Sequence, residues 1–183
     1  MSVFKDKAVV LKIDKIKDKE LLYSLFTYEY WKIKANKKYS AREKSIDLWN
    51  IINFEIHTKE NVSIHKIKNI KIKSVFDIKK EKTFSCINSY LELLALVYRE
   101  ISPWIQNKEI FEIIEHINTY DKIEESKIIL AKIKIKYLLW DIWLEHNNPT
   151  IKKILKFISI NHINEILKLS WINEELKKEL EKI

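Results

Sequence analysis

The sequence predicts an α+β fold, in which a small antiparallel β-barrel is followed by an all-α part. In five segments of the first 75 residues, apolar and polar side chains alternate with the period of two that is typical of strands. After Asp77 the apolar residues recur every three or four positions instead, as they do along helices. The basic excess of the chain also lies in the first part alone. We therefore expect one domain at residues 1–78 and a helical domain at residues 79–183.

The alternating segments are the expected strands of the barrel, and they cover residues 8–13, 20–27, 31–36, 48–57 and 63–75. Polar turns separate them, and an apolar face on every strand favours a closed or nearly closed barrel. In the fifth segment the apolar positions change parity near Asn69, which predicts a β-bulge. The alternation places six side chains inside the barrel: Val9, Leu11, Leu25, Ile33, Phe54 and Ile56.

Helical spacing continues through most of the second part. Ser102-Pro103 and the run from Asn147 to Pro149 interrupt it, because the residue before a proline avoids the helical conformation. The expected helices cover residues 83–101, 107–118, 121–146, 150–159, 161–170 and 171–183.

The chain carries a formal net charge of +8, and its cations are unevenly distributed. Residues 1–80 hold 19 Lys and Arg against 10 Asp and Glu, whereas residues 81–183 hold 15 against 16. Such asymmetry is typical of a polyanion-binding module joined to a neutral scaffold. Only Arg42 and Arg99 are arginines. Since Lys lacks the bidentate fork with which Arg reads base edges, we expect binding to a sugar-phosphate backbone.

The densest basic cluster lies in the third expected strand and the loop after it. Lys32 and Lys34 project from the open face of that strand, and tyrosines beside them can stack on bases. A second set of cations lies on the fifth strand. Two interpretations stay open, a nucleic-acid surface and a solvated hairpin, because exposed strand lysines also prevent aggregation. The candidate DNA-binding residues are Tyr30, Lys32, Lys34, Lys37, Lys38, Tyr39, Arg42, Lys44, Lys66, Lys68, Lys71 and Lys73.

Few residues are suited to catalysis or metal binding. Cys86 is the only cysteine, which excludes an internal disulfide and a multi-cysteine zinc site. His57 and His65 flank the fourth turn, but no third ligand is spaced with them. A chain without glycine has no phosphate-binding loop of a known type. We expect no enzymatic activity, no metal and no other cofactor.

No segment predicts membrane insertion or secretion. No apolar run reaches the length of about 18 residues that a spanning helix needs. The first residues include Lys5, Asp6 and Lys7 and lack an apolar signal region. We therefore expect a cytoplasmic protein, associated with the nucleoid if its ligand is DNA.

Several motifs resemble those of one family. Residues 22–33, LYSLFTYEYWKI, resemble the LLTLFTREYGKI signature of the recombination mediator RecO family. The early segment AVVLKI resembles the first strand of that family, and AREKS falls where the family has a basic RKPKS-like loop. Residues 89–94, SYLELL, resemble the start of its helical part, and residues 136–140, KYLLW, resemble its later KLLELLG motif. The resemblance spans most of the chain and is most specific over residues 20–45.

The resemblance implies an N-terminal OB-fold and a C-terminal helical domain without enzymatic activity. It implies that the protein binds single- and double-stranded DNA and anneals strands. With the partner RecR, it would help to load recombinase onto DNA coated by single-strand-binding protein, whose tail is a further implied partner. Many members carry a four-cysteine zinc module after the KLLELLG motif. That module is absent here, and the region beyond the motif is short.

Two other classes stay open. One is a generic OB-fold module that binds RNA or single-stranded nucleic acid without a role in repair, for example in translation. The other is a structural interaction protein whose basic face merely keeps it in solution. Salt-sensitive binding of oligonucleotides would argue against the second class.

The chain contains no glycine, although an average usage of about 7% predicts roughly 13, and it contains six tryptophans. In the resemblance, Trp31, Trp49 and Trp140 stand where the family has glycine. Two explanations are open. Either UGA codons were read as Trp in a gene whose host reads them as Gly, or a chain biased towards Lys and Ile lost its glycines.

Overall fold

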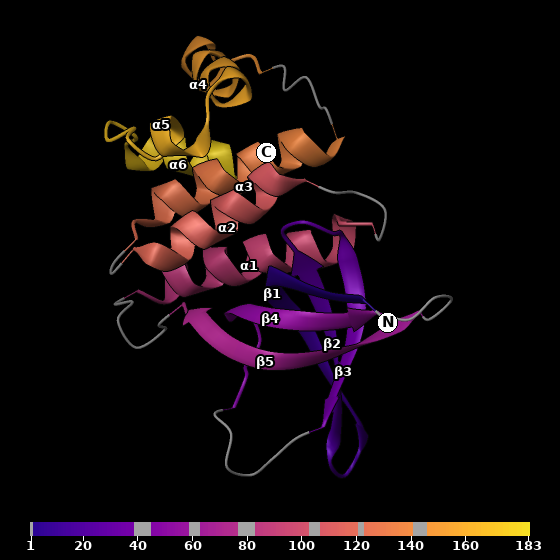
Figure 1. Ribbon diagram of the computed structural model, residues 1–183. Helices are drawn as coiled ribbons and strands as arrows, with labels where there is room; N and C mark the ends of the chain where they lie inside the picture. The colour runs from indigo at the N-terminus through magenta and orange to yellow at the C-terminus, as the bar shows by residue number, and fades with distance from the viewer. Residues whose placement is uncertain are drawn as a thin grey trace. The chain divides into compact units, whose positions relative to one another are not determined.

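A computed structural model describes residues 2–38, 45–58, 63–76, 83–102, 107–120, 123–140 and 146–183. Within these residues five strands precede six helices, in an order that the colour gradient of Figure 1 follows from indigo to yellow. The predicted α+β class is confirmed. The candidate residues Tyr39, Arg42 and Lys44 lie outside the described residues.

The barrel consists of β1 (Ser2–Lys17), β2 (Glu20–Thr27), β3 (Lys32–Lys38), β4 (Ile51–Thr58) and β5 (Ile64–Ser74). The strands form a closed barrel in the order β1-β2-β3-β5-β4. Neighbouring strands are antiparallel except β3 and β5, which are parallel. The long β1 pairs with β4 through its first half and with β2 through its second half. This arrangement is an OB-fold-like barrel.

The helices are α1 (Phe84–Glu100), α2 (Lys108–Thr119), α3 (Glu125–Trp140), α4 (Pro149–Ile160), α5 (Ile163–Ile166) and α6 (Glu174–Glu181). The side chains of Asn148 and Asn173 cap α4 and α6, each accepting a hydrogen bond from a backbone N–H of the first turn. Asn148 is followed by a proline at the first helical position, where its missing N–H costs nothing. None of the described helices is long and apolar enough to cross a bilayer.

The chain forms two compact units. The first combines residues 1–76 with residues 101–119, and the second combines residues 77–100 with residues 120–183. This grouping differs from the single division near residue 78 expected from the sequence, because α2 packs on the barrel. In the second unit α3 is central, since it contacts α1, α4, α5 and α6.

The interior of the barrel confirms four of the predicted core side chains. They lie on three strands of the barrel and project to its inner side. The four are Leu25 on β2, Ile33 on β3, and Phe54 and Ile56 on β4.

The expectation that Val9 and Leu11 point into the barrel is wrong. Ala8 and Val10 belong to the interior cluster instead. Val9 and Leu11 are nonetheless buried, because the outer face of this part of β1 is covered too. Val9 pairs with Phe26 of β2, whose ring packs on α2. In a run that is apolar on both faces, alternation alone does not reveal which face is inside.

The β-bulge predicted near Asn69 is confirmed. Asn53 and Glu55 lie two residues apart on β4, but their partners Lys71 and Lys68 lie three residues apart on β5. The extra residue changes the parity of the side chains that follow it. Asn69 has a φ of 50°, a left-handed conformation that Asn adopts more readily than most residues.

α2 is held on the barrel by aromatic packing. The ring of Phe111 is fully buried and lies 5.9 Å from the ring of Phe26 and 5.4 Å from that of Tyr28. The hydroxyl of Tyr28 donates a hydrogen bond of 3.1 Å to the carboxylate of Glu112. This bond is the main reason why the pKa of Tyr28 is raised. The outer face of the barrel is therefore closed by a helix at this point.

Replacing Phe111 by Ala should destabilise the barrel unit by about 3–5 kcal/mol, because a fully buried ring is lost and a cavity remains. The measurement is the free energy of unfolding in urea. Phe84→Ala is the matched control, since that ring is 83% exposed and its removal should cost little. Equal losses for the two variants would contradict the packing role of Phe111.

Candidate nucleic-acid interface

The parallel pairing of β3 with β5 brings the two sets of candidate lysines together. Lys34 lies opposite Ile64, and Asn36 lies opposite Lys66. Because Ile33 points into the core, Lys34 and Asn36 face outward. Cations that lie about 30 positions apart in the sequence therefore share one outer face of the barrel.

Beside this pairing the surface has a hollow of about 420 Å³. Glu20 is the only acid that lines it, and its carboxylate accepts a hydrogen bond of 2.6 Å from the side-chain amide of Asn36. Four lysines line the same hollow, so its net charge is positive. The lining residues are Glu20, Asn36, Lys37, Lys38, Lys66, Ile67, Lys68 and Asn69.

We define the β3–β5 basic surface as Lys34, Lys37, Lys38, Lys66 and Lys68. Lys37 is half-buried, and the other four are exposed. None of these four forms an ion pair with another residue that the structure describes. Their ammonium groups are therefore available to phosphates.

Lys32 and Tyr30 make contacts within the barrel unit. The half-buried ammonium group of Lys32 donates to the backbone oxygen of Ile101 at 3.3 Å. Burial, and then the charge of Lys34, lower the pKa of Lys32. The ring of Tyr30 lies 5.8 Å from the ring of Phe4, tilted by 60°. Neither residue lines the basic hollow.

Lys73 is bound to α2. The ammonium groups of Lys73 and Lys7 both contact the carboxylate of Glu115, at 2.5 and 2.8 Å. Burial acts to raise the pKa of Glu115, but the two ammonium groups together hold it below its ordinary value. Glu115 thus links α2 to β1 and β5 and neutralises two cations of the barrel.

Lys71 lies beyond the bulge, at a second hollow of about 730 Å³. Three lysines and three acids line this hollow, so their charges nearly cancel. One of the acids, Asp6, is a buried residue that the sequence analysis did not single out. Burial raises its pKa, although the backbone N–H groups of Lys7 and Glu29 donate to its carboxylate at 2.7 and 3.3 Å. In the sequence Asp6 lies between Lys5 and Lys7, so no local pattern marks it as buried.

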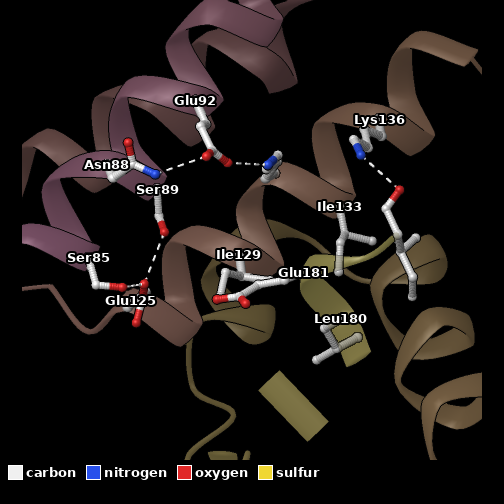
Figure 2. A pocket seen from close by; sticks show the side chains of 12 residues that line it. Ser85, Asn88, Ser89, Glu92, Glu125, Ile129, Ile133, Lys136, Leu180 and Glu181 are labelled. Atoms are coloured by element: carbon white, nitrogen blue, oxygen red, sulfur yellow. Dashed lines mark hydrogen bonds and ion pairs between the residues drawn. The ribbon is translucent and has the colours of Figure 1, made fainter. Parts of the chain in front are cut away.

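The helical unit has a hollow of its own, of about 340 Å³, lined by α1, α3 and the C-terminal residues (Figure 2). Glu92 accepts hydrogen bonds from Asn88 at 2.9 Å and from Lys132 at 2.7 Å. The bond from Lys132 is the main reason why the pKa of Glu92 is lowered. Lys136 donates to the backbone oxygen of Ile183 at 2.8 Å.

Glu125, another acid of this hollow, is paired as well. Glu125 accepts hydrogen bonds from Ser85 and Ser89 and forms an ion pair with Lys177 (Figure 2 shows the two serines). The bond to Glu125 raises the pKa of Lys177. Because three acids and two lysines line the hollow, it is less suited to a polyanion than the β3–β5 basic surface. Sequence spacing did not indicate it, since its partners come from helices far apart in the chain.

The described part of the chain contains no group of three or more His, Cys, Asp or Glu side chains that could hold a metal ion. His57 and His65 do lie on the adjacent strands β4 and β5. His57 is paired with Lys66, and His65 is paired with Ala35, so neither has a further ligand opposite it.

No protein-family model matches the chain, and no curated protein matches it either. Function is therefore inferred from the barrel, the β3–β5 basic surface and the motifs described above. Of these three, the basic surface is the feature in which the structure brings residues that lie far apart in the sequence together at one site.

Replacing Glu115 by Gln should lower the stability of the barrel unit at neutral pH. The folded-state pKa of Glu115 is below its ordinary value of about 4.3. Its contribution is therefore present above that value and is lost as the pH falls through the folded-state pKa. The urea midpoints of the variant and the parent should thus converge below about pH 4. Glu124→Gln, at an exposed position, is the control, and a difference that persists in acid would contradict this account.

Proposed function

We propose that the protein is a DNA-binding mediator of repair and recombination without enzymatic activity. In this role it binds single- and double-stranded DNA, promotes strand annealing and, with RecR, helps to load recombinase. The observation that carries the proposal is the β3–β5 basic surface on an OB-fold-like barrel. OB-folds bind oligonucleotides across the face formed by the second and third strands and the loops beside it.

The chemistry of this surface favours the nucleic-acid backbone over the bases. All five of its cations are lysines, which act as point charges on phosphates. Specific readout of guanine usually needs the bidentate fork of Arg. We therefore expect binding with little sequence preference and a strong dependence on salt.

Annealing follows from the same charge distribution. Two complementary strands repel each other through their phosphates, and this repulsion falls when cations neutralise both strands. A surface that contacts backbones leaves the Watson–Crick edges free to pair. The protein would thus act as a shared counterion for both strands.

The proposed partners, RecR and the tail of single-strand-binding protein, rest on the motif resemblance over residues 20–45 and 89–94. The proposed location is the nucleoid in the cytoplasm, where these partners and DNA occur together. The absence of a four-cysteine motif after residue 140 means that zinc is no part of the proposal.

Replacing Lys34, Lys38 and Lys66 together by Ala should weaken oligonucleotide binding to a similar extent for all sequences. Each phosphate contact contributes about 0.7 to the salt slope for a single strand, so three contacts should lower the slope by roughly two units. The measurement is affinity across a salt series for the variant and the parent.

The matched control replaces Lys152, Lys153 and Lys156, three exposed lysines of α4, by Ala. It removes the same charge from the helical unit and should leave the slope nearly unchanged. If the two triple variants lose slope equally, binding reflects net charge and the β3–β5 basic surface is not the site.

The alternative is a generic OB-fold module for RNA or single-stranded DNA, and the lysines fit it too, because they do not sense the 2′-hydroxyl. Two measurements separate the proposals: the rate of annealing of complementary DNA strands, and co-elution with RecR. A repair mediator should accelerate annealing and retain RecR. Equal affinity for RNA and DNA, with no effect on annealing and no RecR binding, would establish the alternative.

A further inference from the structure

The four tryptophans in the described residues lie in turns or at element ends, where a folded protein often uses glycine. We propose that Trp31, Trp49, Trp140 and Trp171, together with Trp104 and Trp143 outside the described residues, are glycines in the protein that its own cell makes. Each would be encoded by UGA and translated there as Gly. The proposal concerns the covalent structure of the chain and is independent of the proposed function.

Trp49 carries the main observation. Its φ is 69°, in the left-handed region, where a bulky side chain is a genuine outlier and glycine is at ease. It is the third residue of the turn that begins at Asp47, in which the N–H of Asn50 donates to the oxygen of Asp47 at 3.4 Å. Turns with a positive φ at the third position normally have Gly or Asn there.

The backbone of Trp49 is fixed in this conformation by its neighbours. Its N–H donates to the oxygen of Val10 at 2.7 Å. Its own oxygen accepts a hydrogen bond of 3.4 Å from the side chain of Asn118. Relaxing φ to a value that suits Trp would disturb both contacts. The backbone contacts of Trp49 therefore fix its left-handed conformation, which a tryptophan side chain disfavours.

The other described tryptophans also lie at chain reversals or element ends. Trp31 is in the turn between β2 and β3 and is 43% exposed. Trp140 is the last residue of α3, near the place where helices commonly end in glycine. Trp171 lies between α5 and α6 and is 54% exposed. None of the four lies in the interior of a strand or a helix.

Four other aromatic residues fill the cores, although Phe4, Phe84, Tyr98 and Tyr120 are exposed. Tyr23, Phe26, Tyr90 and Phe111 are at most 2% exposed and fill the cores. Of the tryptophan side chains that the structure describes, Trp31 and Trp171 are exposed and Trp49 is half-buried, contrary to the high average burial of Trp.

A reassigned UGA codon would account both for the many tryptophans and for part of the missing glycine. UGA differs by one base from the tryptophan codon UGG and by one base from the glycine codon GGA. A cell that reads UGA as Gly would give a chain with glycines at these positions. The same gene read with UGA as Trp would give a tryptophan at each of these positions and correspondingly fewer glycines, and six tryptophans are present here.

The inference changes how the surface is interpreted. An exposed Trp31 beside Tyr30 would suggest a platform on which bases stack. With glycine at position 31, that turn offers backbone and no indole ring.

The decisive test joins the gene to the native protein. The codons at the six positions are sequenced, and peptides of the protein purified from its own cells are sequenced by tandem mass spectrometry. We expect UGA in the gene, glycine in the peptides and no indole fluorescence from the intact protein. A UGG codon at Trp49, or a tryptophan-containing peptide from native material, overturns the proposal.

A second measurement uses recombinant chains of the printed sequence. Trp49→Gly should raise Tm by a few degrees, because glycine has no Cβ atom to clash with the backbone in the left-handed conformation. Trp31→Gly should not lower it. Leu48→Gly, which removes an exposed apolar side chain from the same turn, is the control and should leave Tm unchanged or lower. A clear fall in Tm for Trp49→Gly would show that the indole is a native packing group and would overturn the proposal.

Discussion

The parallel pairing of β3 with β5 is the interaction on which the barrel and its basic surface both depend. Without it, the chain would form an open sheet with two unpaired edges, which tend to associate with other chains. The pairing closes the sheet around Leu25, Phe54 and their neighbours, and it sets Lys66 beside Asn36. A slip of one residue would turn the lysines of β3 towards the core. The register that buries the apolar side chains is thus the register that gathers the charge.

α2 complements this arrangement by neutralising cations elsewhere on the barrel. Glu115 binds Lys7 and Lys73, while Lys108 of the helix forms an ion pair of 2.7 Å with Glu29. The two cations that Glu115 neutralises thus lie outside the β3–β5 basic surface. Because like charges repel, this ion pairing lowers the repulsion within the barrel and leaves the lysines of that surface unaffected.

The sequence predicted what depends on local periodicity. Phe54 and Ile56 were placed correctly, because polar residues alternate with them along β4, and the parity change at Asn69 revealed the bulge. Val9 was misplaced, because both faces of its strand are buried. Contacts such as Lys73 with Glu115 join residues 42 positions apart, and no spacing rule reports them. The pairing of β3 with β5 was not predicted either, because it is parallel and the sequence predicted an antiparallel barrel.

The cations of the β3–β5 basic surface are all lysines, and the definition of this surface includes no aromatic residue on which a base could stack. This composition determines how it would bind a nucleic acid. Its binding free energy would come chiefly from released counterions, which depends on ionic strength and hardly on base identity. Tyr30 is engaged with Phe4, so it adds little to a base-stacking platform. Such contacts form and break phosphate by phosphate, and another protein can displace them stepwise along a strand. A mediator must release its strand to the recombinase, so exchangeable backbone contacts suit the proposed role better than tight base recognition would.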